Sequence, residues 1–142
     1  MLTTTPSIIA LDIGERRIGV AIGAVQARLA SPLQTLQRSE SIFDEIAQLA
    51  KTQQAVGIVL GLPRGLEGQH TAQTAAVEAF GNALEKMVSV PLYWQDEALT
   101  SRQAEAELVA RGKPYRKEDI DALSATYILE DFMRDHPEIG PS

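Results

Sequence analysis

The pattern of apolar and polar positions divides the chain into short apolar runs and longer segments with helical periodicity. A short apolar run rich in β-branched residues is typical of a strand buried on both faces of a sheet. Residues 8–11 and 18–22 form two such runs with a turn of about four residues between them, which predicts a β-hairpin. Pro32 cannot donate a ladder hydrogen bond and predicts an edge strand. The pattern predicts strands over residues 8–11, 18–22, 27–36, 55–62 and 90–94.

Helical periodicity appears between and after these strands. Ser41-Ile-Phe-Asp44 resembles a capping box and precedes apolar residues at helical spacing. Thr71 opens an alanine-rich segment with its alanines and Phe80 on one face, and Thr100 is expected to cap a further helix. Gly112 and Pro114 separate that helix from the last one. The predicted helices cover residues 41–54, 71–87, 100–111 and 117–134.

Strands joined by hairpins and then alternating with helices predict an α/β domain with a mixed sheet. The 142 residues are expected to form a single domain, residues 1–142, in which 1–7 and 136–142 are flexible. Two predicted internal strands end in acids, at Asp12 and at Asp96-Glu97. If these strands run parallel, their acidic ends meet at the carboxyl edge of the sheet, where α/β proteins bind ligands.

The composition excludes several classes of protein. The absence of cysteine excludes a disulfide framework and a thiolate zinc site, and no apolar stretch approaches the length of a membrane span. The N-terminus has no signal-peptide pattern, so a cytoplasmic protein is expected. The net charge of −6 argues against a generally basic nucleic-acid-binding surface. A local basic rim is still possible, because residues 111–117 hold four of the thirteen basic side chains.

Three acids are the candidates for chemistry. Asp12 and Glu97 lie at strand ends, and Asp121 shares a helix face with Ile128 and Phe132, which belong in a core. We expect the three carboxylates at one rim, where they repel one another unless cations neutralise them. Magnesium binds a few carboxylates together with substrate phosphates, and two such ions catalyse phosphodiester hydrolysis.

Simpler interpretations of the same residues stay open. Asp12 can cap the hairpin, and Asp121 can be an acid favoured at a helix N-terminus by the helix dipole. The basic run 111–117 is more often a solvated loop than a nucleic-acid surface. His70 and His136 lie in a loop and a tail, and we assign neither a catalytic role.

Four segments in this order resemble the YqgF family, also called RuvX, over residues 8–133. They are Ala-Leu-Asp12-Ile-Gly14-Glu-Arg-Arg17-Ile-Gly19-Val-Ala21, Gly61-Leu-Pro63 with Gly68, Asp96-Glu97 with Leu99-Thr100, and Asp121 with Ala125 and Ile128-Leu129. The resemblance implies a ribonuclease H-like fold with a five-stranded mixed sheet in the order 3-2-1-4-5, an antiparallel second strand, and helices on both faces. It also implies that Asp12, Glu97 and Asp121 are the catalytic metal-binding set, with Mg²⁺ or Mn²⁺ as cofactor.

Two positions depart from the family pattern. Ala98 stands where the family usually has an arginine, which removes an expected phosphate contact. Gly23-Ala24 stands where the second strand commonly ends in Ser-Asp, and we expect this change to remove an acid near the rim. The three predicted metal ligands are present, so the resemblance still implies an enzyme, with lower activity.

The resemblance implies a nuclease that processes the 5′ end of pre-16S rRNA. We expect a monomer or homodimer without a membrane partner. A Holliday-junction-resolving DNA nuclease is the alternative, because the same site would cut either backbone. A nucleic-acid-binding module without turnover, and a fragment of a sugar kinase or actin-like ATPase, are further hypotheses. The residues expected to bind nucleic acid are Arg16, Arg17, Arg64, Thr100, Lys113, Arg116 and Lys117.

Overall fold

A computed structural model describes residues 6–97 and 100–138, with the side chains of residues 100 and 101 left out. Its sheet has the order β3-β2-β1-β4-β5, as predicted. β1 is antiparallel to β2 and parallel to β4, and β4 is parallel to β5. The strands are β1 (Ser7–Ile13), β2 (Arg17–Ala24), β3 (Leu29–Gln37), β4 (Ala55–Pro63) and β5 (Leu92–Glu97).

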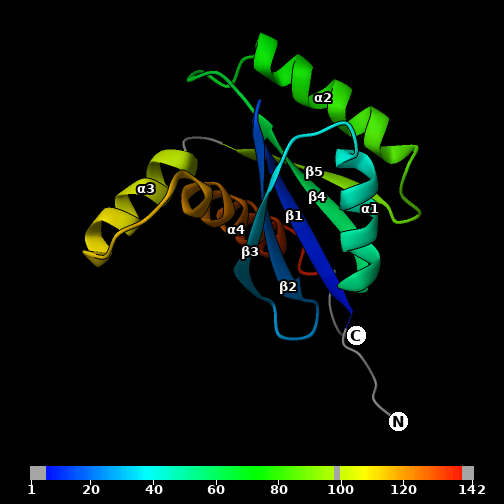
Figure 1. The fold of residues 1–142 in the computed structure, drawn as a ribbon, viewed down its shortest axis with the longest axis horizontal. Helices are drawn as coiled ribbons and strands as arrows, with labels where there is room; N and C mark the ends of the chain where they lie inside the picture. The colour runs from blue at the N-terminus through cyan, green and yellow to red at the C-terminus, as the bar shows by residue number, and fades with distance from the viewer. Residues whose placement is uncertain (1–5, 98–99, 139–142) are drawn as a thin grey trace.

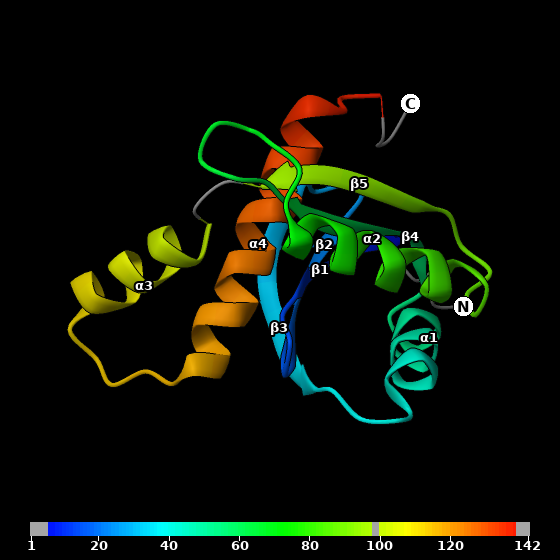
Figure 2. The ribbon, with the colours of Figure 1, turned by 90° about the horizontal axis from the view of Figure 1, so that it is seen from above.

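Helices cover both faces of the sheet, which confirms the predicted arrangement (Figures 1 and 2). α1 (Ile42–Thr52) and α2 (Ala72–Glu85) lie on one face, and α4 (Lys117–Asp135) lies on the other. α3 (Thr100–Arg111) packs against α4, on the side away from the sheet (Figure 2). None of the helices in the described part of the chain has the length and apolar composition needed to cross a membrane.

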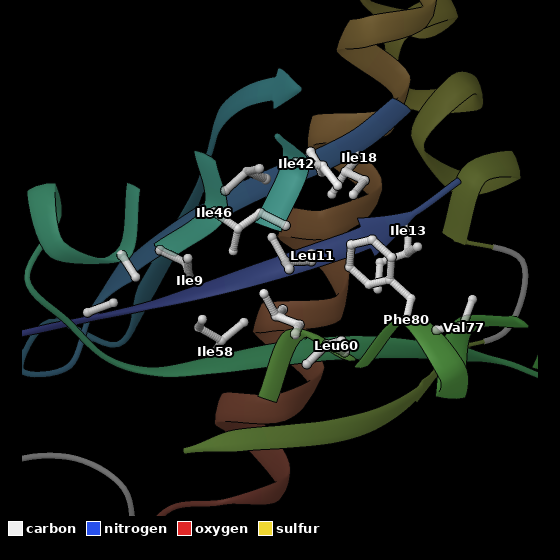
Figure 3. Packing of buried hydrophobic residues seen from close by; sticks show 14 of the residues in the cluster. Ile9, Leu11, Ile13, Ile18, Ile42, Ile46, Ile58, Leu60, Val77 and Phe80 are labelled. Atoms are coloured by element: carbon white, nitrogen blue, oxygen red, sulfur yellow. The ribbon is translucent and has the colours of Figure 1, made fainter. Parts of the chain in front are cut away.

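Alternation along β1 divides the interior into two cores. Ile9 and Leu11 pack with α1 and α2, in a cluster that includes Ile46 and Phe80 (Figure 3). Ile8 and Ala10 point the other way, into the core beneath α4. Successive side chains of a strand point to opposite faces, so Asp12, two residues after Ala10, lies on the α4 face.

The α4 face of β2 carries almost no side-chain volume. Ile18 and Val20 face α1 and α2, whereas the residues between and after them are small: Gly19, Ala21 and Gly23. A Cβ atom at Gly19 would overlap the backbone carbonyl of Asp121, and one at Gly23 would overlap the end of Met133. α4 therefore lies directly on the backbone of β2.

Several predicted boundaries and caps differ from the structure. β5 begins at Leu92 rather than at Val90, and it ends in Gln95, Asp96 and Glu97, as predicted, because these residues pair in parallel with β4. Ser41 makes no side-chain capping hydrogen bond, so the predicted capping box at Ser41 is wrong. Thr71, which was predicted to open a helix, is the N-cap of α2, and its hydroxyl accepts a hydrogen bond from the backbone N–H of Thr74.

Two described residues of the terminal segments contact the rest of the fold. Ser7, placed in a flexible segment by the sequence, is the buried first residue of β1, and its hydroxyl donates to the carbonyl of Gln53. The sequence placed His136 in a flexible tail, and the centroid of its ring lies 4.3 Å from the ring centroid of Phe132. Residues 1–5 and 139–142 lie outside the described part of the chain.

We expect Gly19→Ala to lower the free energy of unfolding by about 3 kcal/mol, because the new methyl group meets the rigid backbone of α4. Urea unfolding followed by circular dichroism measures this change. Gly23→Ala is the matched comparison and should cost less, since the flexible end of Met133 can move aside. Equal losses in the two variants would contradict the proposed close contact at Gly19.

Candidate active site

Asp12 lies near the carboxyl end of β1, on the face covered by α4. The hydroxyl of Ser124, on α4, donates a hydrogen bond to its carboxylate. The pKa of Asp12 rises from 3.8 to about 6, mainly because of burial; the hydrogen bond from Ser124 opposes this rise, and the charge of Asp121 adds to it. The hairpin turn is closed by the N–H of Gly14 donating to the carbonyl of Arg17, so the turn holds without an Asp12 cap.

Glu97 ends β5 and points back over β4. Its carboxylate occupies the space above Gly61 and beside Ile128, where a glycine Cβ would overlap it. Burial first, and then the charge of Asp12, raise the pKa of Glu97 from 4.5 to about 8. Its Oε2 atom is buried and has no hydrogen-bond partner among the described residues. An unpaired buried carboxylate oxygen is costly, and a proton or a cation would relieve that cost.

Asp121 reaches the same edge of the sheet from α4. Its backbone lies on Gly19, the residue of β2 that pairs with Asp12. Its Oδ2 atom accepts a hydrogen bond from Nε of Arg17 at 2.6 Å, and this bond raises the pKa of Arg17. The acid that caps the start of α4 is instead Asp119, whose carboxylate accepts from the N–H of Arg116 at 2.9 Å. Asp121 therefore has a role other than a helix-terminal acid.

The three predicted acids thus converge at the carboxyl edge: the charge of Asp121 acts on Asp12, and the charge of Asp12 acts on Glu97. They do not form a ready metal site, however, since no group of three His, Cys, Asp or Glu side chains in the described residues has that arrangement. Arg17 is the observed partner of Asp121. The unpaired Oε2 atom of Glu97 beside Asp12 fits a cation ligand. The metal-binding role of the set stays a prediction.

The predicted nucleic-acid-binding residues do not form one surface. Arg17 and Lys117 line one groove together with Asp121. Arg64 pairs with Asp96 at 3.3 Å, at the ends of β4 and β5.

The other predicted contacts are spread more widely. Arg116 pairs with Glu118 and Asp119, and Lys113 lines a different cavity, between α3, α4 and β3. Arg16 is exposed in the hairpin turn. The side chain of Thr100 lies outside the described residues, so its predicted role as a cap and nucleic-acid contact has no structural counterpart. All these roles in binding remain predictions.

One expectation about the family departures is wrong. Gly23 pairs with Ile8 and Ala24 with Ser7, at the opposite end of β1 from Asp12. An acid at the end of β2 would therefore lie far from the acidic edge, and Gly23 instead accommodates Met133 of α4. Ala98, the other departure, lies outside the described residues.

The sequence interpretation missed three residues that shape the site. Ser124 follows Asp121 by three positions, and a polar residue at that spacing on an otherwise apolar helix face was the available signal. Gly61 was noted as part of a motif, but not as the space that the Glu97 carboxylate fills. Arg102 lines the groove beside Asp121, and no sequence pattern distinguishes it from other exposed arginines.

Comparisons with known proteins agree with this geometry. The model of the RuvX family, described as Holliday junction resolvase, matches residues 6–135. A Chloroflexus aggregans protein named "Putative pre-16S rRNA nuclease" is 42% identical over 131 residues, covering 89% of this chain and 92% of the relative. A protein of the same name from Pseudomonas aeruginosa strain LESB58 is 33% identical over 135 residues, covering 92% and 94%.

Two solved structures share the fold. T. thermophilus RuvC in complex with a Holliday junction substrate superposes with a TM-score of 0.54 at 16% identity, covering 96% of this chain and 99% of that chain. The fowlpox virus Holliday junction resolvase superposes with a TM-score of 0.56 at 12% identity, covering 91% and 99%. These likenesses confirm the predicted ribonuclease H-like architecture.

Without added metal, we expect stability to fall between pH 5 and pH 8. The folded chain holds protons on Asp12 and Glu97 up to pH values of about 6 and about 8, whereas the unfolded chain releases them near 3.8 and 4.5. Raising the pH therefore favours unfolding, by an amount on the order of 3 kcal/mol. Thermal melts across this range measure the effect.

Glu97→Gln should flatten this pH dependence, because the amide neither ionises nor repels Asp12. Glu67→Gln is the matched control: it removes the same charge from an exposed loop and should keep the wild-type slope. Manganese added at pH 8 should raise the melting temperature of the wild type more than that of Glu97→Gln. A wild-type melting temperature that does not fall up to pH 8 would rule out the crowding of these buried acids.

Proposed function

The chain belongs to the RuvX family, and from this premise we propose that it is a divalent-metal-dependent nuclease that cleaves phosphodiester bonds in pre-16S rRNA. The observation that carries the proposal is the half-buried pair Asp12 and Glu97, in which the buried Oε2 atom of Glu97 has no hydrogen-bond partner among the described residues. A chain that buries two repelling carboxylates loses stability unless the pair binds something positive. The curated relatives favour RNA as the substrate, because they are named for pre-16S rRNA.

In this proposal, Asp12, Glu97 and Asp121 hold Mg²⁺ or Mn²⁺. Such ions, when bound, supply an activated water and stabilise the leaving oxygen of the phosphodiester. Ser124 orients the Asp12 carboxylate through its hydroxyl, and the core beside Ile128 keeps water from the Glu97 carboxylate. Arg17 neutralises Asp121 and, lying at the edge of the site, is placed to contact a substrate phosphate.

A junction-resolving DNA nuclease is the second candidate, favoured by the description of the matching family model as Holliday junction resolvase. The carboxylate edge acts on the phosphodiester and so does not by itself select RNA or DNA. The third candidate, a nucleic-acid-binding module without turnover, shares the binding surface but needs no metal. The fragment of a sugar kinase or actin-like ATPase has no support in the family match.

We expect the wild-type protein to cleave a pre-16S rRNA fragment in Mg²⁺ or Mn²⁺, and Asp12→Asn to reduce the rate at least about 100-fold, because a metal ligand is lost. Gel-resolved time courses on the rRNA fragment and on a four-way DNA junction, side by side, measure this. Asp12→Asn should keep or raise the melting temperature without metal, since it removes the charge repulsion with Glu97.

Asp96→Asn is the matched control, because Asp96 adjoins Glu97 but is exposed and pairs with Arg64. We expect it to retain cleavage within about threefold, as exposed ion pairs contribute little. Cleavage of the junction alone would favour the second candidate. RNA binding without any cleavage that depends on Asp12 would favour the third.

A further inference from the structure

A groove of about 360 Å³ lies next to Asp121, where the start of β2 and the first turns of α3 and α4 meet. It is lined by Arg17, Arg102, Glu105, Lys117, Ile120 and Asp121. Three of these side chains are cations contributed by three different elements. The groove is continuous with the candidate active site, because Asp121 lines both.

The cations of this groove differ from their neighbours in how they are paired. On the same two helices, Arg111 pairs with Glu107, and Arg134 pairs with Asp131 and Asp135. Arg102 and Lys117 make no ion pair with any described residue, although Glu105 lies in the same groove. The nearest side-chain partner of Glu105 is instead the hydroxyl of Tyr115, at 3.4 Å.

Arg17 adds a third positive charge with unused hydrogen-bonding capacity. Its Nε atom donates a hydrogen bond to Asp121, and its two terminal nitrogens make no hydrogen bond to a described residue. A guanidinium has five N–H donors, so Arg17 can hold a carboxylate and a phosphate at the same time.

The walls of the groove are fixed by packing. Ala104 and Leu108 of α3 are buried against Leu123 of α4, with Ile120 packed at the edge of this cluster. A small hydrophobic core therefore fixes the position of α3, which carries Arg102, relative to α4, which carries Lys117. Cations gathered in a concave site repel one another and attract an anion.

We propose that this groove binds a phosphate of the nucleic-acid backbone next to the scissile phosphate, with Arg102 and Lys117 as its main ligands. Arg17 bridges the two positions, because it contacts Asp121 and lines the groove. The inference rests on the proposed function in that the ligand is the backbone of the substrate. It assigns to Arg102 a role that the sequence pattern did not indicate.

Binding can be tested separately from cleavage. In an Asp12→Asn background with EDTA, fluorescence anisotropy would measure the affinity for a labelled single-stranded RNA 20-mer and for DNA of the same sequence. We expect R102Q and K117Q each to weaken binding about fivefold. Each should also reduce the dependence of log K on log salt concentration by about 0.7, as expected for the loss of one phosphate contact on a single strand.

Arg134→Gln is the matched control, since Arg134 lies in the last turn of α4, away from the groove, and should leave the affinity unchanged. Circular dichroism melts verify that the variants fold, and R102K should recover most of the lost affinity. R102Q and K117Q variants that fold and bind like the parent would overturn the proposal, as would a parent that binds neither strand. An effect confined to RNA would also overturn it, because it would indicate recognition of a ribose hydroxyl.

Single neutral methylphosphonate substitutions along the RNA locate the contact. At one position, the substitution should weaken RNA binding by the parent about fivefold. It should leave RNA binding by R102Q unchanged, since that variant has already lost the contact. If no substituted position affects the parent and R102Q differently, the proposal is overturned, because Arg102 then acts only through its long-range charge and contacts no particular phosphate. If only the groove proposal is wrong, the wild-type protein still cleaves RNA, but R102Q and K117Q bind like the parent. If only the proposed function is wrong, the wild-type protein does not cleave, but the two variants still bind more weakly than the parent.

Discussion

The contact between the Asp121 carbonyl and the backbone of Gly19 sets the geometry of the whole candidate site. A side chain at that position would push α4 away from β2. With α4 in contact, Asp121 comes beside the residue that pairs with Asp12, and Ser124 reaches the Asp12 carboxylate. The small residues of β2 therefore serve the site, although none of them carries a functional group.

This close packing has an electrostatic cost that the structure offsets only in part. Asp12 and Glu97 are withdrawn from water near each other, and burial is the main cause of their raised pKa values. Arg17 compensates Asp121, but no described side chain compensates Oε2 of Glu97. An acid pair that lacks a compensating charge at the edge of a sheet lowers the stability of the fold. Such perturbed acids are common at functional sites.

The groove beside Asp121 gathers positive side chains, just as the sheet edge gathers carboxylates. α3 does little for the main core, since it packs on α4 rather than on the sheet. Its contribution is to bring Arg102 into the groove that Lys117 also lines. The acidic edge and the cationic groove share Asp121 and Arg17, so a metal-binding function and a backbone-binding function would meet at one ion pair.

The alternation and periodicity of the sequence determined the strands, the strand that carries Asp12, and the helix face that carries Asp121, because those patterns depend on local geometry. The sheet order, and the assignment of the three acids as one catalytic metal-binding set, came from the family resemblance. Only the tertiary structure decided that Gly23-Ala24 lies far from the acids, that Arg17 pairs with Asp121, and that Arg102 and Lys117 line one groove. These facts depend on strand register and on how closely α4 packs, which are set by contacts between residues distant in the chain.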